Sequence, residues 1–360
     1  MKVVDAFIFY NEVRMLFFRL TELYHVVDFF IIVEATHTFA GNKKTLYYDK
    51  VRRHGLFEHF KDKIIHVVVD DMPNTDNAWD NEKHQRRCID RAIGPLQLAD
   101  DDLILISDCD EIPDSDALRR VRCAELVVNT ALCLEMDMYY YNLTCKGTKW
   151  YCAKIIPYSE YKTTRDPEHT RHISCNTIPA SGWHFSYFGD IDFIQTKIQN
   201  FSHQEYNNAT YLDADKIATQ IETCDDLFFR NNHHTHGFRE VPLHENAYLP
   251  KHRRILMAAP DQPLIVQIMY GVPDNYKDVT DIAVTKAVHG RFIVPRGDGP
   301  GGRLGTFGVD PAPNVTKHVL VHTYRLSDTN VCCETERYDK NSECTIDFNA
   351  RDVIALGSVP

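Results

Sequence analysis

The sequence predicts an α/β protein: an open, mostly parallel sheet with helices on both faces, followed by a small all-β module. Over residues 1–108, short apolar runs alternate with segments of helical periodicity. The runs are continuously apolar, as in parallel strands that are covered on both faces. After residue 258 the pattern changes to short apolar runs separated by Gly, Pro, Asp and Asn, which is typical of a small β module.

The first part of the chain alternates strands and helices. We expect strands at residues 2–10, 28–35, 64–69 and 103–107, and helices at residues 12–25, 51–60 and 78–93. In such a sheet, ligands bind at the carboxyl ends of the strands. Acidic residues lie at three of these ends: Glu34, then Asp70 and Asp71, then Asp108, Asp110 and Glu111. Carboxylates that share one rim of a sheet indicate a cation site there.

The rest of the chain changes character twice. Residues 133–201 are rich in aromatic side chains, which we interpret as strands and loops that fold over the crevice. A polar helix is expected at 214–229, and the following His233, His234 and His236 are interpreted as a polar loop. Beyond residue 258 we expect strands at 264–269, 291–295 and 318–324, and a glycine-rich loop at 297–308. The predicted domains are therefore residues 1–257 and a β-sandwich-like module of uncertain role at 258–360.

Composition excludes several classes of protein. The 360 residues are 44% hydrophobic and 25% charged, as in a soluble globular protein, and the formal net charge of −11 argues against a nucleic-acid partner. We find no signal peptide and no apolar stretch of about 20 residues that would span or anchor in a membrane. The eleven cysteines are odd in number and lack paired spacing, so we expect reduced thiols and a cytoplasmic protein.

The strongest local signal is an Asp-x-Asp motif at a strand end. The apolar run 104–106 leads through Ser107 to Asp108, Cys109 and Asp110. In extended backbone, side chains two residues apart point the same way, so both carboxylates can hold one divalent cation. Their hard oxygen atoms favour Mg²⁺ or Mn²⁺. A solvated turn is the alternative interpretation of this motif taken alone.

Several segments in series carry a family resemblance. They are Asp5–Glu12, Val33–Thr36, Leu46–Tyr48, Val69–Pro73, Trp79–Glu82 with Gln85 and Arg86, Ser107–Pro113, Gly182–Phe188 and Lys197–Glu205. Together these segments resemble glycosyltransferase family seventeen over residues 3–255, and most closely its soluble bacterial and large-DNA-virus members. The resemblance implies a type A glycosyltransferase fold with residues 1–257 as the catalytic domain. It further implies an inverting enzyme, UDP-N-acetylglucosamine as donor and a glycan as acceptor; a viral member would act in the host cytoplasm.

Metal and donor contacts follow from the motif and the resemblance. Asp108 and Asp110 are expected to hold the metal, with His184 as a further ligand or a diphosphate contact. Nucleotide-sugar contacts are expected from Asn11, Glu34, Arg86, Asp108, Trp183 and His184. Structural interpretations stay open for three of them: His184 as a buried histidine bonded to backbone, Trp183 as core, and Arg86 as a surface partner of Glu82.

An inverting transfer also needs a base that takes the proton of the acceptor hydroxyl. Asp192 is the first choice, because the family carries an acidic residue at the matching place, and Asp190 and Glu205 are the reserves. The alternative for Asp192 is a surface loop acid without a catalytic role.

Three other functions remain open at this point. The same fold could use a different nucleotide-sugar donor. A metal-dependent phosphoesterase would also cluster acids and histidines, although it would require two metals. A glycan-binding protein with a spent catalytic site is disfavoured by the presence of both Asp108 and Asp110.

Overall fold

A computed structural model describes residues 1–73, 75–228, 230, 237–259, 262, 263, 265–348, 354 and 355. The chain divides into two compact units, one of residues 1–53 and 57–257 and the other of residues 54–56 and 258–360. His233, His234 and His236 lie outside the described residues. Among the helices that the structure describes, none is both long and apolar enough to cross a membrane.

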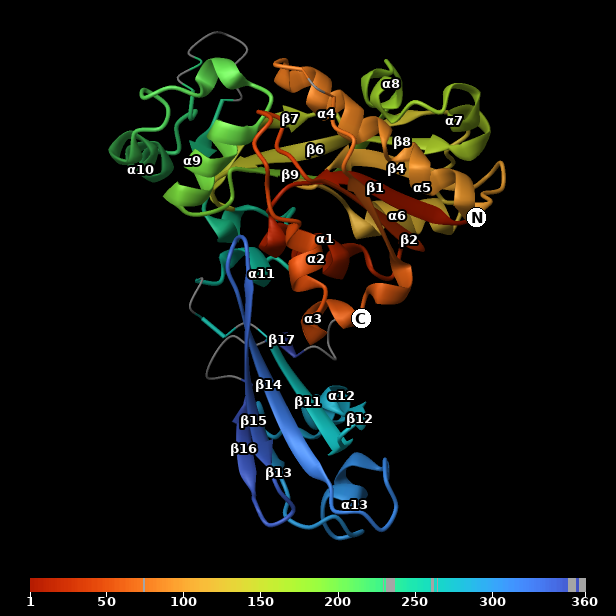
Figure 1. Cartoon of the computed structure of the whole chain (residues 1–360), viewed down its shortest axis with the longest axis vertical. Coiled ribbons are helices and arrows are strands. Elements are labelled where there is room, and N and C mark those ends of the chain that lie inside the picture. The colour runs from red at the N-terminus through yellow and green to blue at the C-terminus, as the bar shows by residue number, and fades with distance from the viewer. Residues whose placement is uncertain are drawn as a thin grey trace. The chain divides into compact units, whose positions relative to one another are not determined.

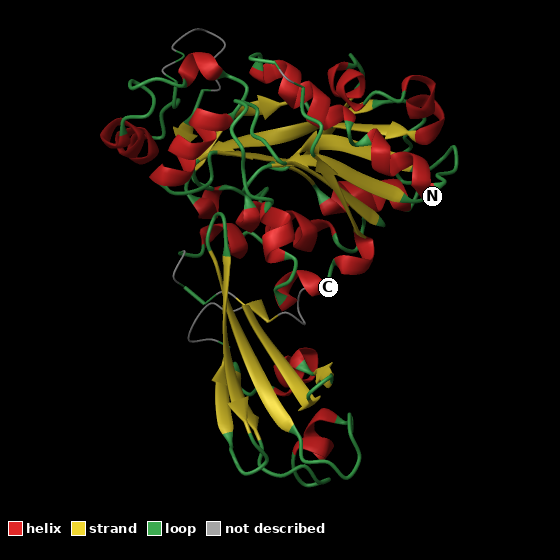
Figure 2. Ribbon diagram, in the orientation of Figure 1, coloured by secondary structure: helices red, strands yellow, loops and turns green. Residues whose placement is uncertain are grey.

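The first unit is built on one ten-stranded mixed sheet (Figures 1 and 2). Its strands are β1 (Val3–Phe9), β2 (Phe29–Ala35), β3 (Ile64–Val69), β4 (Leu103–Asp108), β5 (Glu111–Pro113), β6 (Leu132–Tyr140), β7 (Cys145–Trp150), β8 (Lys154–Pro157), β9 (Thr177–Ser186) and β10 (Arg239–Glu240). The order is β10-β7-β6-β8-β4-β1-β2-β3, and β9 pairs with β5 and β6. Strands β5, β7 and β8 run opposite to the other seven, so the sheet is mostly parallel.

The parallel part of the sheet places the acidic strand ends on one rim. Strand β1 pairs in parallel with β2 and β4, and β2 pairs in parallel with β3. In this register Ile8 lies opposite Asp108, while Phe9 lies opposite Glu34. The carboxyl end of β1 therefore lies between the two acids, as the strand pattern predicted.

Helices cover both faces of this sheet. The helices up to residue 257 are α1 (Val13–Leu23), α2 (Tyr47–Val51), α3 (Gly55–Glu58), α4 (Ala78–Arg87), α5 (Asp90–Ile93), α6 (Ser115–Arg122), α7 (Tyr158–Thr164), α8 (Pro167–His172), α9 (Ile191–Asn200), α10 (Ala214–Thr223) and α11 (Arg254–Met257). In Figure 1, α4, α5, α7 and α8 lie over one face, and α1 and α6 lie over the other. Val4 and Ala6 of β1 pack with Ile89 and Ile93 on the first face, which confirms the expected open α/β layers.

Several helices differ from the expected secondary structure. We expected strands and loops throughout 133–201, but α7, α8 and α9 interrupt that region. The aromatic residues of this region are of the kind that is common in strands, and they hid the weaker helix signals. Those signals are the helix caps: the carboxylate of Asp166 accepts from the backbone N–H of Glu168, and that of Asp190 accepts from the backbone N–H of Phe193. The expected helix at 51–60 is replaced by the shorter α2 and α3, and α10 ends at Thr223, short of residue 229.

The second unit contains two sheets. Its strands are β11 (Ile265–Val272), β12 (Asn275–Asp278), β13 (Arg291–Val294), β14 (His318–Leu326), β15 (Val331–Tyr338), β16 (Cys344–Asp347) and β17 (Ile354–Ala355). The larger sheet has the order β12-β11-β14-β15, with β17 beside β11, and the smaller sheet pairs β13 with β16. Ile268 and Val319 of the first sheet share a core with Phe292 and Ile346 of the second. Two short helices, α12 (Thr280–Lys286) and α13 (Arg303–Phe307), accompany these sheets.

The expectation that all cysteines are reduced is wrong for one pair. Cys145 at the start of β7 and Cys224 at the C-terminal end of α10 form a disulfide across 79 residues of sequence. The other nine cysteines are free. Spacing did not reveal the pair, because its members meet only when α10 packs beside β7 in an apolar cluster with Met138 and Ile217.

We expect that Cys145→Ala or Cys224→Ala lowers the free energy of unfolding by about 2–5 kcal/mol, since the crosslink restricts a long loop of the unfolded chain. Denaturant titration with and without reductant measures this. Cys123→Ala, which removes an exposed free thiol, is the matched control and should leave the transition unchanged. Equal stability of the wild type in the oxidised and reduced forms would contradict the prediction.

Candidate active site

The Asp-x-Asp turn lies where β4 ends. Asp108 is the last residue of β4, and β5 begins at Glu111, so the turn is only two residues long. Asp110 is buried and Asp108 is partly exposed. Strand β9 runs beside β5, and the backbone N–H of Phe185 donates to the carbonyl oxygen of Asp110 over 2.8 Å. The turn is thus fixed between two strands.

A buried arginine of α1 fixes the backbone of this turn. Arg19 of α1 is fully buried and forms an ion pair with Asp5 of β1, whose oxygen atoms it contacts at 2.6 and 2.8 Å. The same guanidinium donates to Ser107 Oγ at 2.6 Å and to the carbonyl oxygens of residues 108, 109 and 111 at 2.7, 3.2 and 2.8 Å. These carbonyl groups therefore point toward α1.

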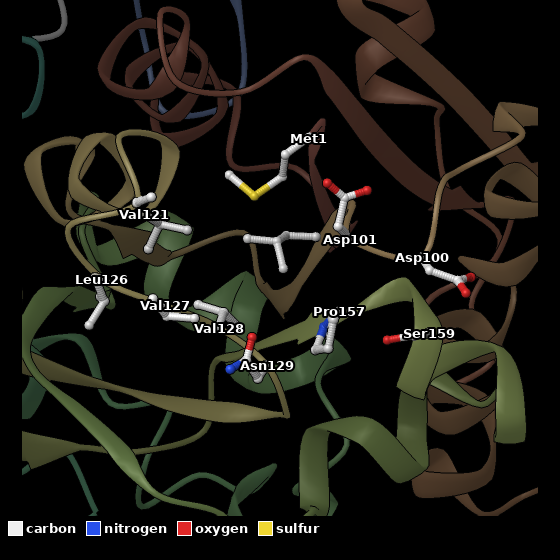
Figure 3. A pocket seen from close by; sticks show the side chains of 12 residues that line it. Met1, Asp100, Asp101, Val121, Leu126, Val127, Val128, Asn129, Pro157 and Ser159 are labelled. Atoms are coloured by element: carbon white, nitrogen blue, oxygen red, sulfur yellow. The ribbon is translucent and has the colours of Figure 1, made fainter.

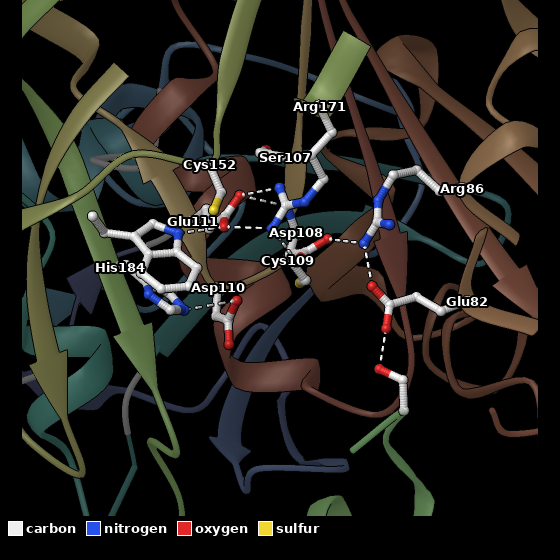
Figure 4. A network of polar contacts seen from close by, with 12 residues as sticks. Glu82, Arg86, Ser107, Asp108, Cys109, Asp110, Glu111, Cys152, Arg171 and His184 are labelled. Carbon is white, nitrogen blue, oxygen red and sulfur yellow. Dashed lines mark hydrogen bonds and ion pairs between the residues drawn. The ribbon is translucent and has the colours of Figure 1, made fainter. Parts of the chain in front are cut away.

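Two further arginines neutralise Asp108 (Figure 4). Arg86 of α4 contacts Oδ1 at 3.0 Å, and Arg171 of α8 contacts Oδ2 at 2.6 Å. Burial raises the pKa of the Asp108 carboxyl, while Arg171 and Arg86 oppose that rise. Arg86 also bonds to Glu82 and Glu168, each at 2.6 Å, so Asp108 belongs to a continuous network of charges.

Asp110 has a different set of partners. Lys197 of α9 lies 2.8 Å from Oδ2, and His184 Nε2 of β9 lies 3.6 Å from Oδ1. Burial alone would raise the pKa of Asp110, but Lys197 and His184 hold it well below its ordinary value. The carboxyl group is therefore ionised at neutral pH. Nδ1 of His184 is buried and has no hydrogen-bond partner among the described residues.

Glu111 connects several groups of this charge network. Its buried carboxylate accepts from Arg171 at 2.7 and 2.8 Å, from the Trp150 indole at 2.6 Å and from the backbone N–H of Asp108 at 2.9 Å. Burial alone would raise the pKa of Glu111, but Arg171 lowers it to about 2. Because all these contacts are internal, Glu111 shapes the turn and orients Arg171.

A cavity of about 580 Å³ opens above the turn. Its ionisable lining contains five carboxylates and four Lys or Arg side chains: Glu12, Glu82, Asp108, Asp110 and Glu168, with Lys83, Arg86, Arg171 and Lys197. Its aromatic lining is formed by Phe9, Tyr10, Phe39, Trp79, Trp150 and Phe201. Such a mixture of apolar wall and few converging polar groups is typical of a small-molecule site. The lining acids and bases do not give the cavity a net positive charge.

The oxygen ligands at the turn fit a hard divalent cation. Asp108 and Asp110 both present carboxylate oxygens to the cavity, and Mg²⁺ and Mn²⁺ prefer such ligands. His184 Nε2 lies 3.6 Å from Asp110 Oδ1, farther than the roughly 3 Å between adjacent ligand atoms of an octahedral Mg²⁺ or Mn²⁺ site, so a bound cation would draw the two atoms together. Asp108, Asp110 and His184, the three metal ligands expected from sequence, thus lie in one cavity wall.

The other predicted donor contacts are placed differently. Arg86 lines the cavity, whereas Asn11, Glu34 and Trp183 do not. Glu34 is buried and bonds to Lys44 at 3.3 Å, to His66 at 3.1 Å and to the backbone N–H groups of residues 47 and 48. The carboxylate therefore fastens the segment before α2 to the sheet. Asn11 is buried, with Oδ1 unpaired among the described residues.

Trp183 and the three predicted base candidates lie outside the cavity lining. Trp183 is buried and stacks on Tyr248 with ring centroids 4.8 Å apart. Asp190 caps α9, and Asp192 lies exposed in the first turn of that helix. Glu205 is exposed and bonds to the cavity residue His203 over 2.7 Å.

Sequence reasoning missed Arg19, Arg171 and Lys197. The Asp166-Pro167 pair, a cap followed by proline at the first helical position, is a signal that would have predicted α8 and directed attention to Arg171. Lys197 begins the last family segment and drew no attention. Nothing in the sequence indicated a role for Arg19, because a charged residue within an apolar helix suggests only that the buried face is interrupted there.

A second cavity of about 350 Å³ lies at the start of β4, away from the acidic rim (Figure 3). Its lining is mainly apolar, with Met1, Val121, Leu126 and Val127 among its residues. Asp100 and Asp101 are its acidic residues, and it contains none of the residues that the sequence singled out.

We expect Arg19→Met to lower the free energy of unfolding by about 3–5 kcal/mol, because it leaves Asp5 buried without its charge partner. Denaturant titration tests this. Arg119→Ala removes an exposed arginine that pairs with Asp116, and it should change stability by no more than about 1 kcal/mol. If both variants unfold like the wild type, the turn does not depend on the Arg19 guanidinium.

Comparisons with known proteins identify the family of this chain. The profile of glycosyltransferase family 17 matches residues 1–248. The β-1,4-mannosyl-glycoprotein 4-β-N-acetylglucosaminyltransferase of Rattus norvegicus is 29% identical over 121 residues, which are 32% of this chain and 22% of that protein. The Homo sapiens protein of the same name is 29% identical over 121 residues, 32% of this chain and 23% of its own length. The matched stretch thus spans less than a quarter of these relatives.

Solved structures give weaker likenesses. A 4-diphosphocytidyl-2C-methyl-D-erythritol synthase from Anaerococcus prevotii has a TM-score of 0.28 and 12% identity, over 49% of this chain and 89% of that chain. A protein described as a glucose-1-phosphate thymidylyltransferase from Bacillus anthracis has a TM-score of 0.31 and 11% identity, over 59% of this chain and 96% of that chain. Likenesses at these TM-scores do not bear on function. The family profile covers more than half of the chain, and the protein therefore belongs to glycosyltransferase family 17.

Proposed function

We propose that the protein is an inverting, divalent-metal-dependent transferase that moves N-acetylglucosamine from UDP to a glycan hydroxyl. The observation that carries the proposal is the pairing of Asp108 and Asp110 on the wall of a 580 Å³ cavity that also contains three cationic side chains, the buried Arg86 and Arg171 and the partly buried Lys197. The donor sugar follows from the names of the rat and human relatives, which are N-acetylglucosaminyltransferases.

A metal is needed because of the charge of the cavity. A nucleotide diphosphate is anionic, and the five carboxylates of the lining outnumber its four Lys and Arg side chains. Asp108, Asp110 and His184 would hold Mn²⁺ or Mg²⁺, which when bound offsets the charge of the leaving diphosphate. Arg171 and Lys197 already contact the two aspartates, so they are positioned to contact phosphate oxygens beside the cation.

The acceptor hydroxyl must lose a proton during the attack on the sugar, and a carboxylate on the cavity wall suits this role. Glu82 and Glu168 are occupied by Arg86. Glu12 lines the cavity, and among the described residues its carboxylate accepts from the backbone N–H groups of residues 10 and 11, at 3.2 and 3.1 Å. We therefore propose Glu12 as the base and keep Asp192, the first choice from the sequence, as the alternative.

Asp108→Asn and Asp110→Asn should each lower turnover at least about a hundredfold, because each removes one charge from the cation site without changing side-chain shape. Release of UDP and formation of the glycan product are measured together, with Mn²⁺ and with a chelator. Asp100→Asn, at an exposed surface acid, is the matched control and should retain activity. Transfer by the double variant in chelator would refute metal dependence, and release of UDP without acceptor would favour a hydrolase.

Glu12→Gln should lower turnover about a hundredfold or more while leaving donor affinity unchanged, because a base acts in the chemical step. Turnover at saturating donor and donor affinity by calorimetry are compared with those of Asp192→Asn, for which we expect little effect. The opposite result, with turnover lost only in Asp192→Asn, would return the role to the exposed acid at the start of α9.

The identity of the donor is tested with a panel of UDP- and GDP-sugars in the presence of Mn²⁺. UDP-N-acetylglucosamine should give the largest increase in melting temperature and the fastest transfer to a mannose-containing glycan. A larger response to another nucleotide-sugar would show that the family fold here serves a different donor.

A further inference from the structure

A second group of metal-ligating side chains lies apart from the cavity lining. Asp71 follows the end of β3, His84 lies in α4 and Cys88 caps the C-terminal end of that helix. One ligand atom from each residue lies within 4.8 Å of the others, and Asp71 Oδ1 is 3.5 Å from His84 Nε2. His84 and Cys88 are four residues apart, so they share a helix face that is turned toward Asp71.

The chemistry of these three ligands favours zinc. A carboxylate oxygen, an imidazole nitrogen and a sulfur form a mixed set that Zn²⁺ accepts in tetrahedral geometry, whereas a thiolate sulfur does not suit Mg²⁺ or Mn²⁺. Cys88 is 3% exposed, while Asp71 is exposed and His84 is partly exposed. The group therefore has a buried soft ligand and an open side toward solvent, through which an ion can enter and a water molecule can complete the set. We propose that Asp71, His84 and Cys88 form a zinc site.

Binding requires only a small contraction of the group. In a tetrahedral zinc site, ligand atoms lie about 3.3–3.8 Å apart, so the 3.5 Å between Asp71 and His84 already fits. The thiol proton of Cys88 would pass to solvent as the sulfur binds. Arg91 donates to both oxygens of Asp71, at 2.7 and 3.0 Å. This guanidinium competes with the ion for Asp71.

The position of the site gives zinc a structural effect. Helix α4 also carries Gln85, which bonds to the carbonyl oxygens of Phe9 and Val33, and Arg86, which bonds to Asp108. A zinc ion held by Asp71 and by two residues of this helix region would fasten α4 to the end of β3. Zinc would therefore stabilise the helix that supplies one of the arginines at the Asp-x-Asp turn.

The test is a zinc titration of the full chain by calorimetry and thermal shift. To remove binding at the proposed catalytic cation site, all variants are made in an Asp108→Asn, Asp110→Asn background. Cys88→Ser and His84→Ala should each weaken zinc binding at least about tenfold. Cys123→Ser and His169→Ala, at exposed positions elsewhere, are the matched controls and should bind like the parent. His84→Ala keeps the test valid if Cys88→Ser does not fold.

Two further measurements separate this site from an incidental surface one. Arg91→Met should strengthen zinc binding, since it removes the competing cation from Asp71. Cobalt bound in place of zinc should show a thiolate-to-metal charge-transfer band that disappears in Cys88→Ser. The proposal is overturned if Cys88→Ser and Cys123→Ser bind zinc equally, or if the cobalt spectrum lacks the thiolate band.

Discussion

The ion pair between Arg19 and Asp5 is the constraint on which the rest of the site depends. A buried ion pair is stabilising only when its remaining hydrogen-bonding groups are satisfied. Here the guanidinium meets that condition by bonding to Ser107 and to three carbonyl groups of the turn. Since the carbonyl groups are held toward α1, the side chains of Asp108 and Asp110 are free to meet partners in the cavity. The buried guanidinium of Arg19 thus sets the direction in which the side chains of Asp108 and Asp110 point.

The cavity is assembled from parts that are distant in sequence. The two aspartates come from the strand β4 and its turn, whereas their cationic partners come from three helices: Arg86 from α4, Arg171 from α8 and Lys197 from α9. Each aspartate would be costly to bury alone, and each cation likewise. The network is therefore complete only when all three helices are docked on the sheet, so folding and formation of the site are coupled.

The sequence predicted what depends on local pattern. Continuous apolar runs located the parallel strands, and the strand ends located Asp108 and Asp110, because both follow from periodicity alone. Arg171 lies in a region whose aromatic residues suggested strands, and its contact with Glu111 spans 60 residues. Glu34 looked like a ligand at a strand end, but long-range bonds to Lys44 and His66 occupy it. Pattern therefore locates a rim of the sheet but does not identify the partners that converge on it.

The disulfide has a consequence for how the cavity opens. The span between Cys145 and Cys224 contains four residues of the cavity lining, Trp150, Arg171, His184 and Lys197, together with the strands β7, β8 and β9. When part of this span opens locally, the crosslink keeps the two ends of the span together. The detached segment is then a closed ring with a high effective concentration near its docking surface, so it returns faster than an open chain of equal length. The crosslink thus favours reclosure over further unfolding, and it does so without touching either aspartate.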